Sequence, residues 1–167
     1  MIEGVKITPL KQIFDERGKV MHMMRADSEI FTQFGEIYFS CTNPGAIKAW
    51  HLHKEATLNY ACVFGKVKLV LFDERKKSKT FGEYQELFLS LDNYSLITIP
   101  PNIWNGFKGM NKESSIIANC LNLPHNEKCK LMSSKLSAPC EVEEAWKIFR
   151  KYSYDNFIAA TKLSMAS

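Results

Sequence analysis

The sequence lacks long apolar runs, paired cysteine motifs and low-complexity tracts. No apolar run reaches the roughly 18 residues that a membrane-spanning helix needs, so we expect no membrane partner. The first twelve residues, MIEGVKITPLKQ, contain no apolar core of a signal peptide, and we expect a cytoplasmic protein. The five cysteines are odd in number and show no CxxC spacing, which argues against a disulfide framework and against a thiolate zinc site.

The chain also lacks a strong charge of one sign. Its 22 basic and 18 acidic residues give a net charge of +4. The densest basic run, ERKKSK at residues 74–79, has no aromatic side chains that would stack on bases, so we predict a solvated turn and no nucleic-acid partner. The mild positive balance suits a small molecule that carries phosphate.

The distribution of strand-forming residues predicts an all-β fold. From residue 36 to residue 120, short aromatic and β-branched segments alternate with turn residues, and no helix-length periodic segment interrupts them. This pattern favours a sandwich or barrel over a parallel sheet. After residue 136 the pattern changes: Val142, Ala145, Trp146 and Phe149 recur at helical spacing. We therefore predict one β-domain over residues 1–136 and a helical tail over residues 137–167 that packs on this domain or on a partner subunit.

The stretch WHLHK places His51 and His53 two residues apart, so that on a strand both imidazoles point to one face. Together with Gly45 and Gly65, this step resembles the first half of the metal motif of the cupins, which are small jelly-roll barrels. Residues 57 and 58, where a glutamate ligand belongs, are Thr and Leu, and Asn105 stands where the final histidine belongs. Two imidazoles are too few for a zinc or iron site, so we predict no metal.

A second cupin-type family is similar over residues 1–126. The motifs that carry this resemblance are DERG (15–18), GEIYFSCTNPGAIKAWHLHK (35–54), FDERKKSKTFGE (72–83), ITIPPNIWNGFKG (97–109) and IANC (117–120). In this order and spacing they resemble the nucleotide-sugar epimerases typified by dTDP-4-dehydrorhamnose 3,5-epimerase, and most closely a divergent branch with a W-H-x-H-K signature.

The resemblance implies a cupin-type jelly-roll β-sandwich, here with a C-terminal helical extension, that assembles as a homodimer. It implies a nucleotide-linked 4-keto-6-deoxy sugar, most often dTDP-linked, as substrate in polysaccharide or deoxysugar biosynthesis. The reaction removes a proton from a carbon next to the ketone and returns one from the opposite face, without a cofactor. A histidine suits the role of base because its pKa lies near neutrality.

The resemblance also assigns site residues. His51 falls on the catalytic base, and Lys48 falls where an arginine contacts the substrate and would stabilise the oxyanion or a phosphate. Arg17, in the DERG motif, is expected to reach the nucleotide phosphates of a partner subunit. The expected substrate-binding residues are Arg17, Tyr38, Ser40, His53, Asp73, Arg75, Trp104 and Asn105.

The chain departs from the family at two catalytic positions. The aspartate that supports the histidine base has no counterpart in MSSKLS (132–137), and the proton-donating tyrosine has none in LNLPHN (121–126). Three interpretations stay open. The chain is an epimerase with a rearranged donor set, a keto-isomerase that moves the ketone between neighbouring carbons, or a non-catalytic cupin that binds a sugar nucleotide or a partner protein.

Overall fold

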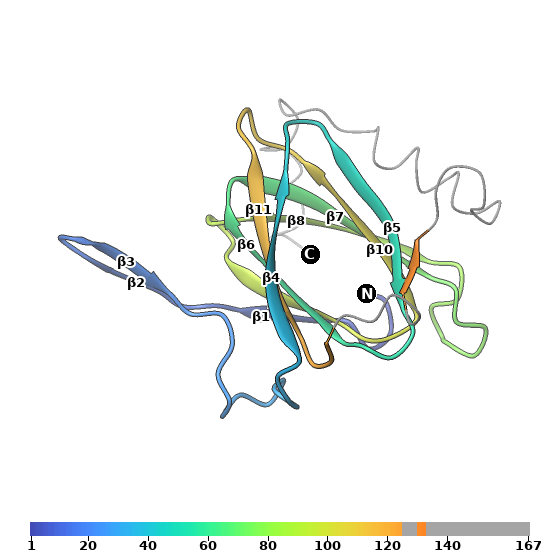
Figure 1. Cartoon of the computed structure of the whole chain (residues 1–167). Helices are drawn as coiled ribbons and strands as arrows, with labels where there is room; N and C mark the ends of the chain where they lie inside the picture. The colour runs from blue at the N-terminus through green and yellow to red at the C-terminus, as the bar shows by residue number, and fades with distance from the viewer. Residues whose placement is uncertain (125–129, 133–167) are drawn as a thin grey trace.

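The computed structural model describes residues 1–124 and the backbone of residues 130–132, and all regular secondary structure in these ranges is β-strand. Two five-stranded antiparallel sheets lie face to face (Figure 1). The first contains, in spatial order, β1 (Lys6–Pro9), β9 (Ser95–Ile99), β6 (Leu58–Phe64), β11 (Ser115–Leu121) and β4 (Glu36–Thr42). The second contains β12 (Lys130–Met132), β5 (Ile47–His53), β10 (Ile103–Gly109), β7 (Lys66–Asp73) and β8 (Tyr84–Ser90). The predicted all-β sandwich is confirmed.

The alternation of side chains along each strand builds the core between the sheets. On β7, Val67, Leu69 and Leu71 point inward and pack with residues of the opposite sheet such as Ile97 and Ile117. All five are at most 1% exposed. Burying each such side chain contributes about 1.5–3 kcal/mol, so this shared core is the main force that holds the two sheets together.

The outer face of the second sheet is apolar as well. Trp50 and Leu52 of β5, Val70 and Phe72 of β7 and Trp104 of β10 form a separate buried cluster there. Strand β7 is therefore covered on both faces, which explains why residues 69–72 at its centre form a continuous apolar run.

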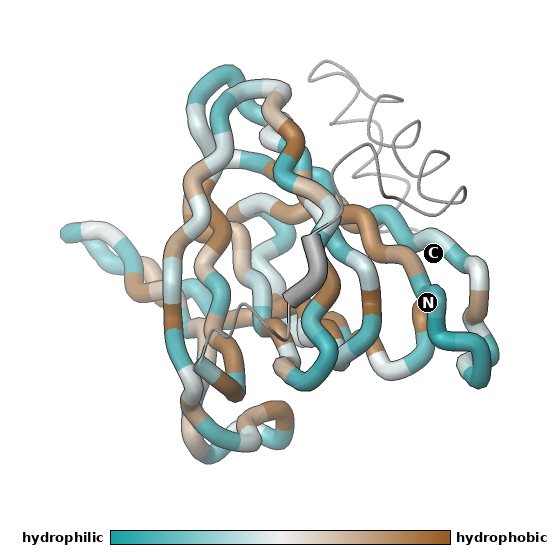
Figure 2. The backbone as a smooth tube through the Cα atoms, turned by 45° about the vertical axis from the view of Figure 1, so that its right-hand side comes forward, coloured by the Kyte–Doolittle hydropathy of each residue, from teal (hydrophilic) through white to brown (hydrophobic). Residues whose placement is uncertain are grey.

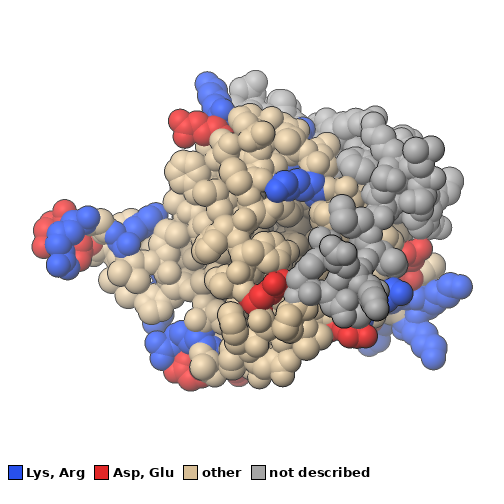
Figure 3. Space-filling model, viewed as in Figure 1, with Lys and Arg blue, Asp and Glu red and all other residues tan. Residues whose placement is uncertain are grey.

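A two-stranded hairpin projects from the sandwich. It consists of β2 (Gln12–Asp15) and β3 (Gly18–Met21), and Figure 1 shows it extending well away from both sheets. Ile13, Phe14 and Val20 on it are 54–68% exposed. The tip of the hairpin is hydrophilic (Figure 2) and carries both signs of charge (Figure 3). Exposed apolar side chains on a projecting arm are typical of an interaction surface.

Two predictions concern residues outside the described ranges. The amphipathic helix and the domain boundary at residue 136 both fall there. Across the part of the chain that is described, no helix is long and apolar enough to cross a membrane.

Candidate functional site

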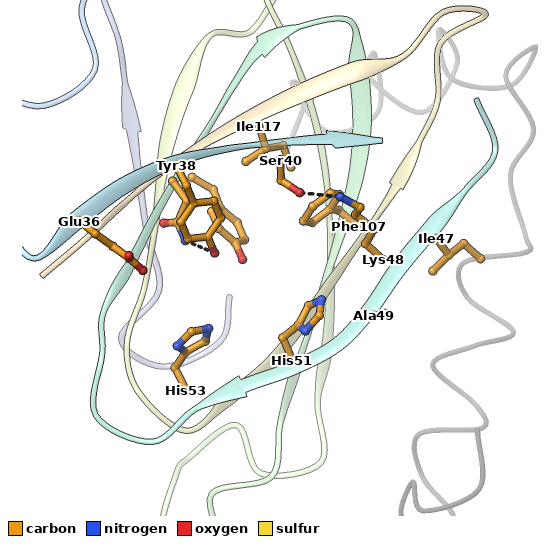
Figure 4. Close-up of a pocket in the computed structure, with 12 residues that line it drawn as sticks. Glu36, Tyr38, Ser40, Ile47, Lys48, Ala49, His51, His53, Phe107 and Ile117 are labelled. Atoms are coloured by element: carbon orange, nitrogen blue, oxygen red, sulfur yellow. Dashed lines mark hydrogen bonds between the residues drawn. The ribbon is translucent and has the colours of Figure 1, made fainter. Parts of the chain in front are cut away.

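A cavity of about 610 Å³ opens between the two sheets (Figure 4). The first sheet lines it with side chains from β4, β6 and β11, and the second with side chains from β5 and β10. Five residues that the sequence predicts for the site meet here: His51 and Lys48 as catalytic residues, and Tyr38, Ser40 and His53 as substrate-binding residues. The other lining residues are Glu36, Ile47, Ala49, Tyr60, Phe107, Ile117 and Asn119.

The alternation of β4 supplies one wall. Glu36, Tyr38 and Ser40 face the cavity, whereas Ile37 and Phe39 between them lie on the exposed outer face. The Oε1 atom of Glu36 is buried and accepts no hydrogen bond from the residues that the structure describes. A buried oxygen without a donor costs about 1–3 kcal/mol, so a donor on a bound molecule would bind favourably at this point.

A β-bulge places Lys48 on the same face as His51. Residues three apart on a regular strand point to opposite faces. Here Asn105 of β10 pairs with His51, but Phe107 pairs with Lys48, so the two strands lose one residue of register between these pairs. The extra residue in β5 turns Lys48 back toward the cavity, where its Nζ donates a 2.9 Å hydrogen bond to Oγ of Ser40 on the opposite sheet.

Gly106 of β10 makes room for this bulge. A Cβ atom at residue 106 would lie 2.3 Å from the Cβ of Ala49 and 3.2 Å from the carbonyl oxygen of Lys48. No side chain fits at the first distance, so the close approach of β5 and β10 requires glycine.

Polar side chains of the first sheet form a row across three strands. Tyr38 of β4 and Tyr60 of β6 both pair with Asn119 of β11. Nδ2 of Asn119 donates to the hydroxyl oxygen of Tyr38 at 2.9 Å. The Tyr60 hydroxyl donates to Oδ1 of Asn105 at 3.1 Å, and Nδ2 of Asn105 donates to the backbone carbonyl of His51 at 3.0 Å. The row thus connects the tyrosine wall to the strand that carries the histidines.

Burial affects the acidity of both tyrosines. It raises the pKa of Tyr38 above its ordinary value, while the hydrogen bond from Asn119 acts in the opposite direction. Burial raises the pKa of Tyr60 further, to well above its ordinary value, and the neighbouring Tyr38 adds to this effect. Both phenols are therefore protonated at neutral pH.

Five of the predicted substrate-binding residues do not line this cavity. Trp104 belongs to the apolar cluster on the other face of the second sheet, and its Nε1 donates to Glu74 at 2.6 Å. Asn105 faces inward but is fully buried behind Tyr60. Arg17 lies at the turn of the projecting hairpin, where its guanidinium pairs with Asp15 at 2.7 Å.

Asp73 and Arg75 support the fold rather than the cavity wall. Asp73 is fully buried and accepts hydrogen bonds from the guanidinium of Arg75 and the hydroxyls of Ser78 and Thr80 at 2.6–2.8 Å. Burial alone raises the pKa of Asp73, but these donors together lower it well below its usual value. Arg75 also donates to the carbonyl of Glu3, which fastens the N-terminal segment to the end of β7.

Metal-binding side chains do not cluster in the described ranges. No group of three or more His, Cys, Asp or Glu residues there is arranged to hold a metal ion. The absence of a metal stays a prediction from the missing ligand positions in the sequence.

Sequence reasoning missed three polar lining residues. Glu36 follows from Tyr38 by alternation on the same strand, so the sequence contains a signal for it. Asn119 and the cavity-facing role of Tyr60 depend on the register of β4, β11 and β6, which are far apart in the sequence, and no local pattern reveals them.

Comparison with known proteins finds one family and several relatives. The family model of dTDP-4-dehydrorhamnose 3,5-epimerase matches residues 1–138. A probable low-salt glycan biosynthesis epimerase, Agl13, from Haloferax volcanii is 32% identical over 120 residues, which are 71% of this chain and 77% of that protein. The spore coat polysaccharide biosynthesis protein SpsL from Bacillus subtilis is 34% identical over 108 residues, which are 65% of this chain and 72% of that protein.

One solved structure covers nearly the whole chain. The crystal structure of a dTDP sugar isomerase from Desulfovibrio desulfuricans G20 superposes with a TM-score of 0.79 at 36% identity. The match covers 92% of both chains.

Proposed function

The chain belongs to the dTDP-4-dehydrorhamnose 3,5-epimerase family and is a sugar epimerase, and from this premise we propose that its cavity binds a dTDP-linked 4-keto-6-deoxy sugar and inverts a carbon next to the ketone. The observation that carries this proposal is the convergence of His51 and Lys48 in one cavity that faces a wall of hydroxyl groups. The relatives in glycan and spore coat polysaccharide biosynthesis support a role in making a surface polysaccharide.

In this proposal His51 is the base. The ketone acidifies the neighbouring C–H because the electron pair of the broken bond moves onto the ketone oxygen. An imidazole within reach takes the proton and typically accelerates such a step by about 10²–10⁴. The second imidazole, His53, lies on the same face of β5 and shapes the floor of the cavity.

Lys48 is suited to the charge that develops on the ketone oxygen. Its ammonium group is already held in the cavity by the hydrogen bond to Ser40, so it need not reorganise when the enolate forms. The buried Oε1 of Glu36 would accept a hydrogen bond from a sugar hydroxyl, which would orient the ring.

We further propose that the enzyme is a homodimer. Arg17 sits at the tip of a hairpin that extends away from its own cavity, so it would meet the diphosphate of a substrate in a second subunit (Figure 1). The exposed Ile13, Phe14 and Val20 on the same hairpin supply apolar surface for such a contact. The free thiols of Cys41, Cys62 and Cys120 suit a reducing compartment, which supports a location in the cytoplasm.

The test is product formation from a dTDP-4-keto-6-deoxy sugar, followed by NMR. Proton coupling constants around the ring report which carbon is inverted. His51→Asn should reduce the rate by at least about 10², whereas His53→Asn should have a milder effect. Thermal unfolding of each variant controls for folding.

The other two interpretations predict different spectra. A keto-isomerase would move the ketone to a neighbouring carbon, which shifts the carbonyl resonance. A non-catalytic cupin would bind the sugar nucleotide and leave the spectrum unchanged. Either result contradicts the proposed function.

A further inference from the structure

Inversion at a carbon requires a second proton-transfer group on the side opposite the base. This inference rests on the proposed function, in which His51 is the base. The family's usual donor tyrosine has no counterpart in residues 121–126. Two other tyrosines, Tyr38 and Tyr60, line the cavity from the sheet that faces His51. The question is which of them has a proton to give.

The orientation of the Asn105 amide shows that the hydroxyl proton of Tyr60 is already used in a hydrogen bond. Nδ2 of Asn105 lies 3.0 Å from the carbonyl oxygen of His51, which can only accept. The amide nitrogen must therefore face this carbonyl, and the amide oxygen must face Tyr60. Because an amide oxygen has no proton, the Tyr60 hydroxyl donates its single proton to Asn105.

The orientation of the Asn119 amide shows that Tyr38 accepts a hydrogen bond from this residue and does not donate one to it. Oδ1 of Asn119 accepts from the backbone N–H of Asn59 at 3.1 Å, and a backbone N–H can only donate. The orientation of this amide is therefore fixed as well, with Nδ2 toward Tyr38. The Tyr38 oxygen accepts this bond, so its own O–H is not used by Asn119. The Tyr38 and Tyr60 hydroxyls also form a hydrogen bond with each other, and because the Tyr60 proton goes to Asn105, the Tyr38 O–H is the group that would turn from Tyr60 to a substrate in the cavity.

We propose that Tyr38 is the catalytic acid that delivers a proton to the substrate from the face opposite His51. Figure 4 shows Tyr38 on β4 and His51 on β5 reaching into the cavity from opposite walls. A sugar ring held between them would lose a proton to one wall and gain one from the other, which is the requirement for inversion.

The proton balance closes without a co-reactant. His51 takes the C–H proton and becomes imidazolium, and the electron pair forms an enolate whose oxygen faces Lys48. The enolate carbon then takes the O–H proton of Tyr38, and the carbonyl reforms. Tyr38 is left as a phenolate, which the N–H of Asn119 stabilises through a charge-assisted hydrogen bond. Exchange with solvent returns the proton from His51 to Tyr38 after product release.

Asn119 and Tyr60 act as positioning residues in this scheme. Asn119 holds the Tyr38 oxygen and lowers the pKa of a phenol that burial otherwise raises. Tyr60, through Asn105, ties the same wall to the backbone of His51. Both therefore fix the distance across which the proton must travel.

The experiment compares two rates in D2O. Deuterium wash-in at the carbon next to the ketone reports proton removal by His51, and the appearance of the epimer reports delivery to the other face. In Tyr38→Phe we expect wash-in to stay within about tenfold of the wild type, because His51 can return deuterium to the same face. Epimer formation should fall by at least about 10², in line with the loss of a general acid. The matched control is Tyr84→Phe, which removes a hydroxyl from the outer cluster, where Tyr84 stacks on Phe72, and should leave both rates unchanged.

The outcomes separate this proposal from the proposed function. If the wild type shows neither wash-in nor epimer, the proposed function fails. If Tyr38→Phe forms the epimer within tenfold of the wild-type rate, or loses wash-in together with inversion while it still binds dTDP, Tyr38 is not the acid.

If the Tyr38→Phe variant does not fold, a second measurement tests the proposal. Site-specific 3-fluorotyrosine at residue 38 keeps the shape of the side chain and lowers the pKa of the phenol. Because the acid must be protonated, the basic limb of the kcat profile should move to lower pH, and the same replacement at residue 84 should not move it. A basic limb that stays in place overturns the proposal.

Discussion

Gly106→Ala should damage catalysis although residue 106 is not among the residues that line the cavity. The new Cβ would lie 2.3 Å from the Cβ of Ala49, whereas carbon atoms prefer a separation of about 3.5–4.0 Å. Strands β5 and β10 must therefore separate by more than about 1 Å at the bulge that turns Lys48 into the cavity. Overpacking of this kind costs about 1–3 kcal/mol.

Two effects follow from that displacement. For a chain of this length each kcal/mol lowers the Tm by about 2–4 °C, so the Tm should fall by about 2–12 °C. A shift of about 1 Å in a catalytic group costs about 100-fold in rate, so kcat should fall by about that factor while KM for the sugar nucleotide changes less. Calorimetry and steady-state kinetics measure the two effects.

The matched control is the double variant Gly106→Ala with Ala49→Gly. It removes the 2.3 Å contact and leaves the closest remaining neighbour at 3.0 Å, so most of the Tm and kcat should return. Such recovery is the coupling that a double-mutant cycle measures. A Gly106→Ala enzyme with wild-type kcat, or a double variant no better than the single one, would refute the assigned role of the bulge.

Three further results are expected. Asp73→Asn should lower the free energy of unfolding at pH 7, measured by urea denaturation, by about 1.5–3 kcal/mol, since it removes the charge from a buried carboxylate that accepts hydrogen bonds from Arg75. The lowered pKa of Asp73 means that this stabilisation is present above the unfolded pKa of about 3.9 and is lost as the pH falls further. From pH 7 to pH 2 the wild type should therefore lose more stability than Asp73→Asn, and an equal loss in the two proteins would contradict this role of Asp73. Mixing Arg17→Ala with His51→Asn subunits should restore about a quarter of wild-type activity, because half of the randomly formed dimers then hold one intact site of two; activity no greater than the sum of the separate variants would exclude a role across subunits. Burial raises the pKa of Cys62 to about 12, so peptide mapping after alkylation at pH 8 should find Cys62 unmodified and the exposed Cys41 modified. Equal modification of the two thiols would contradict the burial of Cys62.

The sequence predicted the fold because strand alternation and turn residues are local signals. The same alternation correctly placed His51 and His53 on one face, and it would have placed Lys48 on the other. Only the resemblance to the family put Lys48 in the site, and the physical reason is the bulge, which becomes visible once the pairing of β5 with β10 is known.

Trp104 shows the opposite case. It was expected to bind the substrate, yet Asn105 next to it faces inward, and neighbours on a strand point to opposite faces. Its hydrophobic environment lies on the outer face of the second sheet, which the sequence alone does not distinguish from the cavity wall. The Tyr38, Asn119 and Tyr60 row was equally hidden, since three distant segments must align to form it.

The claim that His51 removes a proton next to a ketone is tested most directly by solvent deuterium. Wild-type protein with a dTDP-4-keto-6-deoxy sugar in D2O should incorporate deuterium at a carbon flanking the ketone, seen as the loss of its proton NMR signal. His51→Asn, with an unchanged Tm, should incorporate it at least about 10² more slowly. Wild-type incorporation no faster than in buffer, or equal incorporation by the variant, would contradict the account.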